Sequence, residues 1–346
     1  MAKITVLGTG GWGIALAVMA NRCGHTVSAW SPFKEEINAI RRFDENKTLL
    51  PGIAVPPAID LTADPGCAAE ADLTIVAVPS FAIEETAELF AARLPARPLI
   101  ACAAKGISGK RRLTELIAEK LSDTRPGARM VALSGPSHAE EVGRGLPTTV
   151  VSASVDKEAA AAVQELLMNP RFRIYISDDM VGVELGGALK NVIALAAGIC
   201  DGLGLGDNAR AALMTRGLAE MTRLGMAMGA RAETFAGLSG MGDLIVTCSS
   251  MHSRNRRAGI LIGQGLPPDE AVRAVGTVEG YHAAKTAYEL AAASGADMPI
   301  ARQCYRICYE GHAPAEALTA LMERPGRHET EGQWLKQNKI FKKGRV

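Results

Sequence analysis

The first half of the chain alternates short apolar runs with stretches of helical periodicity, and this alternation limits the possible folds more than any other feature. The runs are ITVLG, TVSAW, LTIVAVP, PLIACAAKG and RMVALSGPS, followed by TTVVSASV and FRIYI. Strands separated by helices run parallel, because parallel neighbours cannot be joined by tight turns. Runs that are apolar on both faces are typical of strands covered on both sides. The pattern predicts an α/β fold with a doubly wound, mostly parallel sheet over residues 1–177.

The pattern changes after residue 177. The segments VELGGALKNVIALAAGI, ARAALMTRGLAEMTRLGMAMG and VEGYHAAKTAYELAAASG carry apolar residues at helical spacing, and strand signals almost vanish. A chain of 346 residues also exceeds what one hydrophobic core usually serves. We therefore expect a second, all-helical domain over residues 178–335, which shares a tight cleft with the first domain. A basic, flexible tail should follow over residues 336–346.

Composition excludes several classes of partner. A formal net charge of +1 provides no basic stripe for nucleic acid, so any bound phosphate should be small and locally held. The seven cysteines are scattered, which indicates reduced core residues in a cytoplasmic protein and no metal site. The N-terminal apolar run is too short for a signal peptide, and no run is long enough for an integral membrane segment.

A glycine motif directly follows the first predicted strand. The segment GTGGWG matches G-x-G-x-x-G and opens a predicted helix, which is the context that a dinucleotide site requires. Gly8 permits the tight turn, and Gly10 leaves room for pyrophosphate beside the backbone. Gly13 lets the helix pack closely on the strand. A glycine turn without a ligand is the alternative, but strand, helix and position all favour a Rossmann-type nucleotide site.

The end of the second predicted strand bears on the choice of coenzyme. An acidic residue at this position accepts hydrogen bonds from the ribose hydroxyls of NAD. Here the strand ends at Trp30 and continues as Ser-Pro-Phe-Lys. Ser31 and Lys34 can donate to a 2′-phosphate, which a carboxylate would repel. We therefore predict that the chain accepts NADH or NADPH and prefers NADPH.

Two lysines are candidates for the chemical site. Lys105 follows a predicted strand in AAKG, at the carboxyl edge where open α/β sheets bind their ligands. The segments AVPS and LSGPS follow other strands at the same edge. Lys190 lies within GGALKNVIALAAG, where an ammonium is buried only against a partner. A solvated charge at Lys105 and a snorkelling side chain at Lys190 are the alternatives.

A carboxylate and a basic segment complete the set of candidates. Asp243 is the only charged residue in GLSGMGDLIVTC and can pair with the two lysines. The segment SRNRR follows at residues 253–257, and the guanidinium fork of arginine suits phosphate oxygens. Taken alone, such a charge run also describes a solvated helix face.

Together these segments resemble one family from end to end, the bacterial-type NAD(P)-dependent glycerol-3-phosphate dehydrogenases. The shared motifs, in order, are GTGGWG, AVPS, AAKGI, LSGPSHAEE, ELGGALKNVIALAAG, GDNARAALMTRGLAEM, GLSGMGDLIVTC, SRNRR and VEGY. The resemblance implies a Rossmann domain followed by an all-helical domain like the C-terminal domain of 6-phosphogluconate dehydrogenase. Two segments depart from the family pattern: NKTLLP lacks the common aromatic residue before its proline, and Ser-Pro-Phe-Lys after the second strand is unusual.

The resemblance also implies roles for individual residues. Lys190 is the expected catalytic proton donor and acceptor, with Lys105 and Asp243 beside it. The implied coenzyme contacts, beyond the three glycines, are Gly11, Trp12, Lys105, Ala139, Arg254 and Glu279. The implied substrate contacts are Lys105, Gly135, Ser137, Lys190, Asp243, Ser253, Arg254 and Asn255.

The implied reaction is reversible hydride transfer between NAD(P)H and dihydroxyacetone phosphate, which gives sn-glycerol 3-phosphate for glycerophospholipid synthesis. In it Lys105 should lower the pKa of Lys190 by like-charge repulsion, and Asp243 should raise it. His138 and His252 flank the site as spectators. An Ala- and Met-rich helical domain favours a homodimer. Two alternatives stay open: a related hydroxy-acid or sugar-phosphate dehydrogenase, and a catalytically silent NADP-binding sensor.

Overall fold

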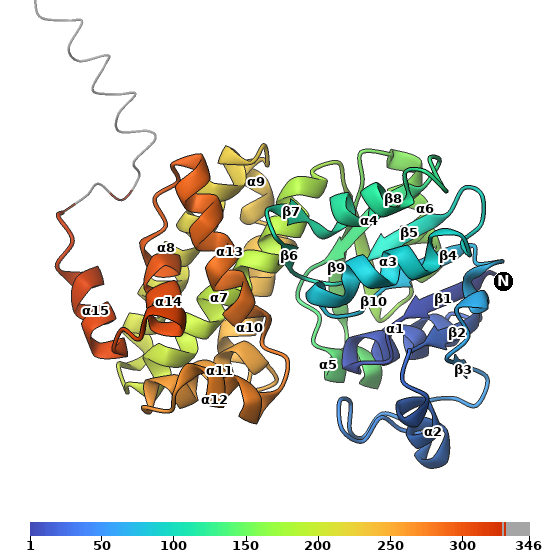
Figure 1. The fold of residues 1–346 in the computed structure, drawn as a ribbon, viewed down its shortest axis with the longest axis horizontal. Helices are drawn as coiled ribbons and strands as arrows, with labels where there is room; N and C mark the ends of the chain where they lie inside the picture. The colour runs from blue at the N-terminus through green and yellow to red at the C-terminus, as the bar shows by residue number, and fades with distance from the viewer. Residues whose placement is uncertain (327–328, 330–346) are drawn as a thin grey trace, which may run out of the picture.

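A computed structural model of the chain describes residues 1–326 and 329. It consists of a sheet-containing half and a helical half that lie side by side (Figure 1). The sheet contains every long strand of this part of the chain, and the last strand ends at Ser177. The first long helix begins at Met180. The predicted basic tail over residues 336–346 lies outside the described residues.

The sheet has eight strands in the order β10-β9-β8-β5-β4-β1-β2-β3. All neighbouring strands are parallel except β8 and β9, which are antiparallel. The strands of the sheet are β1 (Lys3–Leu7), β2 (Thr26–Trp30), β3 (Asp60–Thr62), β4 (Leu73–Val76), β5 (Leu99–Cys102), β8 (Arg129–Ser134), β9 (Thr148–Ala153) and β10 (Phe172–Ser177). A small hairpin comprises β6 (Ile107–Ser108) and β7 (Arg111–Arg112). The predicted mostly parallel sheet is therefore confirmed.

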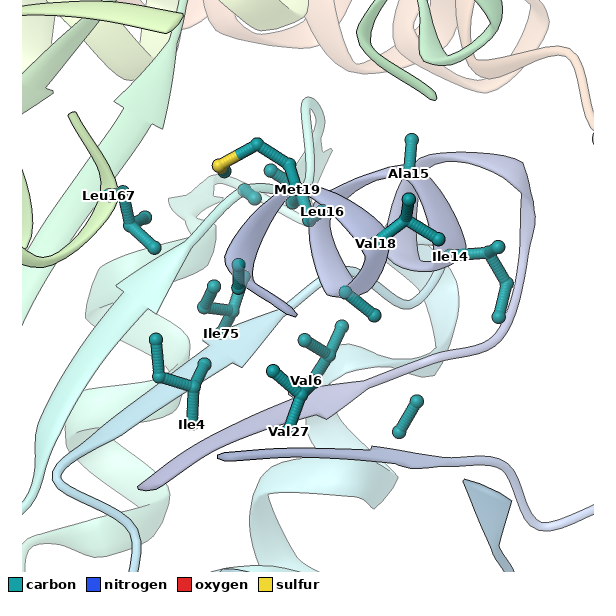
Figure 2. Packing of buried hydrophobic residues seen from close by; sticks show 14 of the residues in the cluster. Ile4, Val6, Ile14, Ala15, Leu16, Val18, Met19, Val27, Ile75 and Leu167 are labelled. Atoms are coloured by element: carbon teal, nitrogen blue, oxygen red, sulfur yellow. The ribbon is translucent and has the colours of Figure 1, made fainter. Parts of the chain in front are cut away.

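Helices connect these strands and bury their apolar faces. They are α1 (Gly11–Arg22), α2 (Lys34–Phe43), α3 (Ile83–Ala91), α4 (Leu113–Leu121), α5 (Ala139–Arg144) and α6 (Lys157–Leu167), with short helices η1 (Pro65–Ala68) and η2 (Ser80–Ala82). Figure 2 shows Ile14, Leu16 and Val18 of α1 in one cluster with Val6 of β1 and Ile75 of β4. These side chains are fully buried, and each contributes about 1.5–3 kcal/mol of hydrophobic stabilisation. The packing fixes α1, and with it the glycine loop that precedes it.

The helical half is built around α7 (Met180–Gly202). Its other elements are α8 (Gly206–Ala227), α9 (Ala232–Phe235), η3 (Leu238–Gly242), α10 (Asp243–Ser249), α11 (Arg254–Gly263), α12 (Pro268–Val275), α13 (Glu279–Ser294), α14 (Pro299–Glu310) and α15 (Pro314–Met322). By length and composition α7 alone among the described helices is apolar enough to cross a membrane, but its most apolar window is 94% buried within the protein. Such burial is typical of the core helix of a helical domain. The predicted all-helical character of this half is confirmed.

Glycines let α11 approach α7 closely. A Cβ atom added at Gly198 of α7 would lie 2.1 Å from the carbonyl oxygen of Arg256. One added at Gly259 of α11 would lie 2.2 Å from the carbonyl oxygen of Leu195. Only glycine permits these backbone contacts, which hold α11 against the C-terminal half of α7.

Candidate active site

The glycine loop has the geometry that the motif predicts. Gly8 has a φ of +114°, and its N–H donates to the carbonyl of Trp30 at 2.8 Å. A Cβ atom at Gly13 would lie 1.9 Å from the carbonyl oxygen of Gly8, so this glycine is required for the turn. A Cβ atom at Gly10 would meet nothing within 4 Å. This open space at the N-terminal end of α1 fits the pyrophosphate of a dinucleotide.

Other predicted coenzyme contacts lie around this loop. The Cβ positions of Gly11 and Ala139 are 3.8 Å apart, which brings α5 beside the start of α1. The indole Nε1 of Trp12 donates to the carbonyl of Ala103 at 3.0 Å. This bond ties the loop to the segment that carries Lys105. The loop and the lysine therefore belong to one edge of the sheet, as predicted.

The coenzyme prediction that was based on Ser31 and Lys34, at the end of β2, is wrong on one point. It assumed that no carboxylate lies there, whereas Ser31 Oγ donates to Glu36 Oε2 at 2.8 Å. The single proton of the Ser31 hydroxyl is thus committed to a carboxylate. Lys34 is the exposed first residue of α2, and none of the described contacts involves its ammonium. Sequence inspection missed Glu36 because it comes from the first turn of the next helix.

Lys190 lies in the core of the molecule with its ammonium bonded to two oxygens. Its Nζ donates to Asp243 Oδ1 at 2.7 Å and to Thr247 Oγ1 at 2.6 Å. The Lys190 side chain is 7% exposed and that of Asp243 is 1% exposed. An ammonium has three N–H donors, and no third partner of Lys190 exists among the described residues. Snorkelling is therefore excluded, and one N–H is available to a ligand.

Lys105 approaches the same carboxylate from the sheet-containing half. Its Nζ donates to Asp243 Oδ2 at 2.9 Å, to the carbonyl of Gly135 at 2.8 Å and to Ser137 Oγ at 3.1 Å. These three bonds use all of its donors. Asp243 thus bridges Lys105 and Lys190 across the seam between the two halves. The predicted pairing of the two lysines with Asp243 is confirmed as a contact.

The electrostatics of this cluster depend on burial and charge together. The pKa of Lys190 is lowered to about 8, because burial and the charge of nearby Lys105 lower it more than Asp243 raises it. Burial by itself would raise the pKa of Asp243, but the ammonium groups of Lys105 and Lys190 outweigh it and hold the pKa below its usual value. The cluster therefore combines an ionised carboxylate with a lysine that can gain or lose a proton near neutral pH.

Adjacent glycines on α7 explain how distant segments reach Lys190. A Cβ atom at Gly186 would lie 2.6 Å from the carbonyl oxygen of Ser239, in η3 just before Asp243. One at Gly187 would lie 2.5 Å from the Oγ of Ser134, at the end of β8. The two glycines of ELGGALKN thus let η3, from the helical half, and the end of β8, from the sheet-containing half, pack directly against α7.

The start of α11 supplies the predicted phosphate-binding residues. Ser253 caps the helix and accepts from the backbone N–H of Arg256. Arg254 is exposed and forms no hydrogen bond or ion pair with a described residue, so its guanidinium is free for a ligand. Asn255 is buried; its amide donates to Asn191 Oδ1 at 2.9 Å. In this structure Ser253 and Asn255 therefore hold backbone and neighbouring side chains in place.

Glu279 at the start of α13 joins the two halves a second time. Its carboxylate accepts from Ser80 Oγ at 2.6 Å and from the Ser80 backbone N–H at 3.1 Å. Gly106 allows this contact, since a Cβ there would lie 2.5 Å from the Ser80 Cβ. Motifs AVPS, AAKGI and VEGY therefore converge on one point of the seam.

Sequence reasoning missed three further residues at the site, Glu36, Asn191 and Thr247, and it placed Ser80 at the sheet edge without predicting its contact with Glu279. The signal for Thr247 was available, because it follows Asp243 by four residues on a helix and therefore shares its face.

His138 and His252 lie near each other, with ring centroids 5.7 Å apart. Burial and the charge of Lys190 lower the pKa of His138, which favours its neutral form.

Two family models match the chain. Residues 3–160 match the family model described as NAD-dependent glycerol-3-phosphate dehydrogenase N-terminus. Residues 179–319 match the model for the C-terminus of the same family.

Individual relatives are similar over nearly the whole chain. A protein of Moorella thermoacetica named glycerol-3-phosphate dehydrogenase (NAD(P)+) is 52% identical, over 96% of this chain and 99% of its own. One of the same name from Desulfitobacterium hafniense is 48% identical, over 96% and 94%. A crystal structure of glycerol-3-phosphate dehydrogenase from Coxiella burnetii matches with a TM-score of 0.89 and 39% identity, over 93% of this chain and 99% of that one. This chain therefore belongs to the NAD-dependent glycerol-3-phosphate dehydrogenase family.

Proposed function

We propose that this chain interconverts dihydroxyacetone phosphate and sn-glycerol 3-phosphate with a nicotinamide coenzyme, and that Lys190 moves the proton. One observation carries the proposal. Lys190 is buried at the seam, bonded to Asp243 and Thr247, with its third N–H unclaimed by any described residue. Burying an ammonium is costly, and a free donor on it is the mark of a site that awaits a polar ligand.

The coenzyme, when bound, supplies or accepts the hydride. Lys190 donates its unclaimed proton to the carbonyl oxygen of dihydroxyacetone phosphate as that oxygen gains negative charge. In the reverse direction the neutral amine accepts the proton from the hydroxyl of glycerol 3-phosphate. A pKa of about 8 suits both directions, because neither protonation state is scarce near neutral pH.

Asp243 and Lys105 set the conditions for this proton transfer. Asp243 holds both ammonium groups through its two oxygens, at 2.7 and 2.9 Å, and so fixes Lys190 in position. Lys105 contributes positive charge beside the developing alkoxide and orders Gly135 and Ser137 for substrate contact. Charge that is fixed before the reaction stabilises the transition state without reorganisation.

Arg254 binds the phosphate of the substrate in this proposal. Its exposed guanidinium can form a two-pronged contact with phosphate oxygens. Ser253 and Asn255 belong to the same N-terminal end of α11, where backbone N–H groups also favour an anion. Asn255 acts in part through Asn191, to which its amide donates, and through Gly280, whose backbone N–H donates to the Asn255 Oδ1.

The sheet-containing half, residues 1–177, holds the coenzyme, and the helical half, residues 178–335, provides most of the substrate site. The pyrophosphate lies against the glycine loop. The coenzyme-binding residues that we propose are Gly8, Gly10, Gly11, Trp12, Gly13, Lys105, Ala139, Arg254 and Glu279. Arg254 and Glu279 would close over the coenzyme from the helical half.

Three properties of the whole protein belong to the same proposal. All seven cysteines are free thiols, which suits the reducing cytoplasm. Met226 and Met322 expose 56% and 77% of their surfaces on the helical half, which favours a homodimer through this half. The product, glycerol 3-phosphate, would enter glycerophospholipid synthesis. Light scattering at several protein concentrations tests the dimer, which a constant monomer mass would contradict.

A spectrophotometric assay at the nicotinamide absorption band tests the activity. We expect rapid oxidation of reduced coenzyme with dihydroxyacetone phosphate and slow oxidation with dihydroxyacetone, since the latter offers no phosphate to Arg254. A panel of hydroxy acids and sugar phosphates serves as the comparison. A higher kcat/KM for another panel member would contradict the substrate. Tight coenzyme binding without any turnover would indicate a sensor instead.

A further inference from the structure

A carboxylate lies at the end of β2, beside the glycine loop. Glu36 is the third residue of α2, and its Oε2 accepts the proton of Ser31 Oγ at 2.8 Å. Ser31 is the first residue after β2 and is 2% exposed. The carboxylate thus reaches back from the helix to the strand end.

Glu36 is also connected to the glycine loop itself. The amide Nδ2 of Asn46 donates to the carbonyl of Thr9 at 2.9 Å and lies 3.5 Å from Glu36 Oε1. Thr9 is the second residue of GTGGWG. One buried amide therefore joins the carboxylate to the backbone that receives the pyrophosphate. In a Rossmann fold this corner is where the adenosine ribose lies.

Helix capping does not account for this position of Glu36. A glutamate at the third position of a helix commonly accepts from the backbone N–H of the N-cap residue. Here the N-cap residue is Phe33, and its N–H lies 3.3 Å from Ser31 Oγ instead. No lysine or arginine of the described residues forms an ion pair with Glu36, and the nearby Lys34 is exposed. Within residues 1–326, therefore, no cationic partner neutralises the charge of Glu36.

We propose that Glu36 is a specificity-determining residue that makes this chain select NADH over NADPH; the inference rests on the proposed dehydrogenase function. The carboxylate accepts hydrogen bonds from ribose hydroxyls but repels a 2′-phosphate. Ser31 cannot offer its only proton to that phosphate while it bonds to Glu36. Both effects disfavour NADPH at the same place.

Fluorescence titration of the full-length protein with each reduced coenzyme tests the proposal without any substrate. Two like charges about 4 Å apart at a protein surface change affinity by roughly tenfold or more. We expect wild type to bind NADH at least about tenfold more tightly than NADPH. Glu36→Gln keeps the size of the side chain and removes its charge, so it should tighten NADPH binding by a similar factor. Its effect on NADH should be smaller, because an amide oxygen still accepts from a hydroxyl.

Glu35→Gln is the matched control, because it removes one exposed charge from the same turn of α2. It should leave the ratio of the two affinities unchanged. Glu36→Asp keeps the charge and should keep the preference for NADH. The proposal is overturned if wild type binds NADPH as tightly as NADH, or if Glu36→Gln shifts the ratio no more than Glu35→Gln does. If Glu36→Gln does not fold, the ratio of NADH to NADPH affinity in the wild type decides the proposal by itself.

The titration tests the role of Glu36 and the activity assay tests the proposed function, so each can be refuted without the other. If dihydroxyacetone phosphate is not reduced but NADH still binds more tightly, the proposed function is wrong and the role of Glu36 stands. If the substrate is reduced equally well with both coenzymes, with equal affinities, the function stands and the role of Glu36 is wrong.

Discussion

The glycine loop and the lysine–aspartate cluster perform their tasks by opposite means. The loop uses backbone groups and empty space, so its geometry depends on residues a few positions apart, such as Gly8 and Gly13. The cluster uses buried charge, and its members are far apart in sequence: 138 positions separate Lys105 from Asp243, and 53 separate Lys190 from it. The loop is a local structure, whereas the cluster exists only once the whole chain has folded.

This difference predicts different responses to mutation. A substitution in the loop should change coenzyme affinity or stability through steric clashes, with little dependence on pH. A substitution of Lys190 or Asp243 should change the rate and its pH dependence, with little effect on coenzyme affinity. Three experiments separate these two responses, and a fourth tests the phosphate contact of Arg254.

The largest effect is expected from Lys190→Ala. Positioned proton transfer typically contributes about 10² to 10⁴ in rate, so kcat/KM for dihydroxyacetone phosphate should fall by at least that order. NADH affinity should stay within a few-fold of wild type, because Asp243 keeps its ion pair with Lys105. Steady-state kinetics and a coenzyme titration measure the two quantities.

Lys157→Ala is a suitable control, since this lysine is exposed at the start of α6. It should leave both quantities unchanged. Turnover at the wild-type rate in Lys190→Ala would remove Lys190 from the mechanism. A proportional loss of coenzyme binding would instead mean that the variant disturbs the fold.

The second largest effect comes from a pair of loop variants. At Gly10 the backbone φ is −62° and an added Cβ meets nothing within 4 Å, so Gly10→Ala should fold normally but weaken coenzyme binding by at least about tenfold. At Gly13 the added Cβ would lie 1.9 Å from the Gly8 carbonyl, so Gly13→Ala should lose about 1–3 kcal/mol of stability or more. Thermal melts and NADH titrations of both variants check this contrast. Equal melting temperatures for the two would show that the loop is not locally constrained as described.

A smaller effect is expected from Arg254→Ala. Loss of a charge-assisted phosphate contact of about 1.5–3 kcal/mol should raise KM for dihydroxyacetone phosphate by roughly ten- to a hundredfold. The change in kcat should be smaller, since the proton donor is intact. Arg257→Ala is the matched control, because Arg257 is exposed on the same helix. Equal KM values for the two variants would assign the phosphate to other residues.

Sequence reasoning succeeded best where structure is local. The parallel sheet, the glycine loop and the helical second half follow from patterns within short windows, and all three are present. The reversed direction of β9 did not follow, because nothing in TTVVSASV distinguishes a parallel strand from an antiparallel one. Only the short connection through α5 turns the chain back beside β8.

For the lysine–aspartate cluster, the sequence predicted the residues but not how they contact one another. Asp243 was a candidate because it is a lone charge among glycines and apolar residues, and Lys190 because its helix is apolar. That one carboxylate holds both lysines depends on the packing of α10 against α7, which no local pattern encodes. Helical periodicity could have predicted that Thr247 lies on the same helix face as Asp243. Glu36 could not be predicted from the strand end alone, because it belongs to the first turn of α2 and reaches back to Ser31 only in the folded chain.

The most direct test of the cluster is the pH dependence of glycerol 3-phosphate oxidation. Oxidation needs the neutral amine of Lys190, so in wild type kcat should rise with pH through a limb near 8. Asp243 raises the pKa of Lys190, so Asp243→Asn should move this limb to lower pH while lowering the plateau. A limb that stays in place in Asp243→Asn, or that moves to higher pH, would contradict a proton transfer by Lys190 under the control of Asp243.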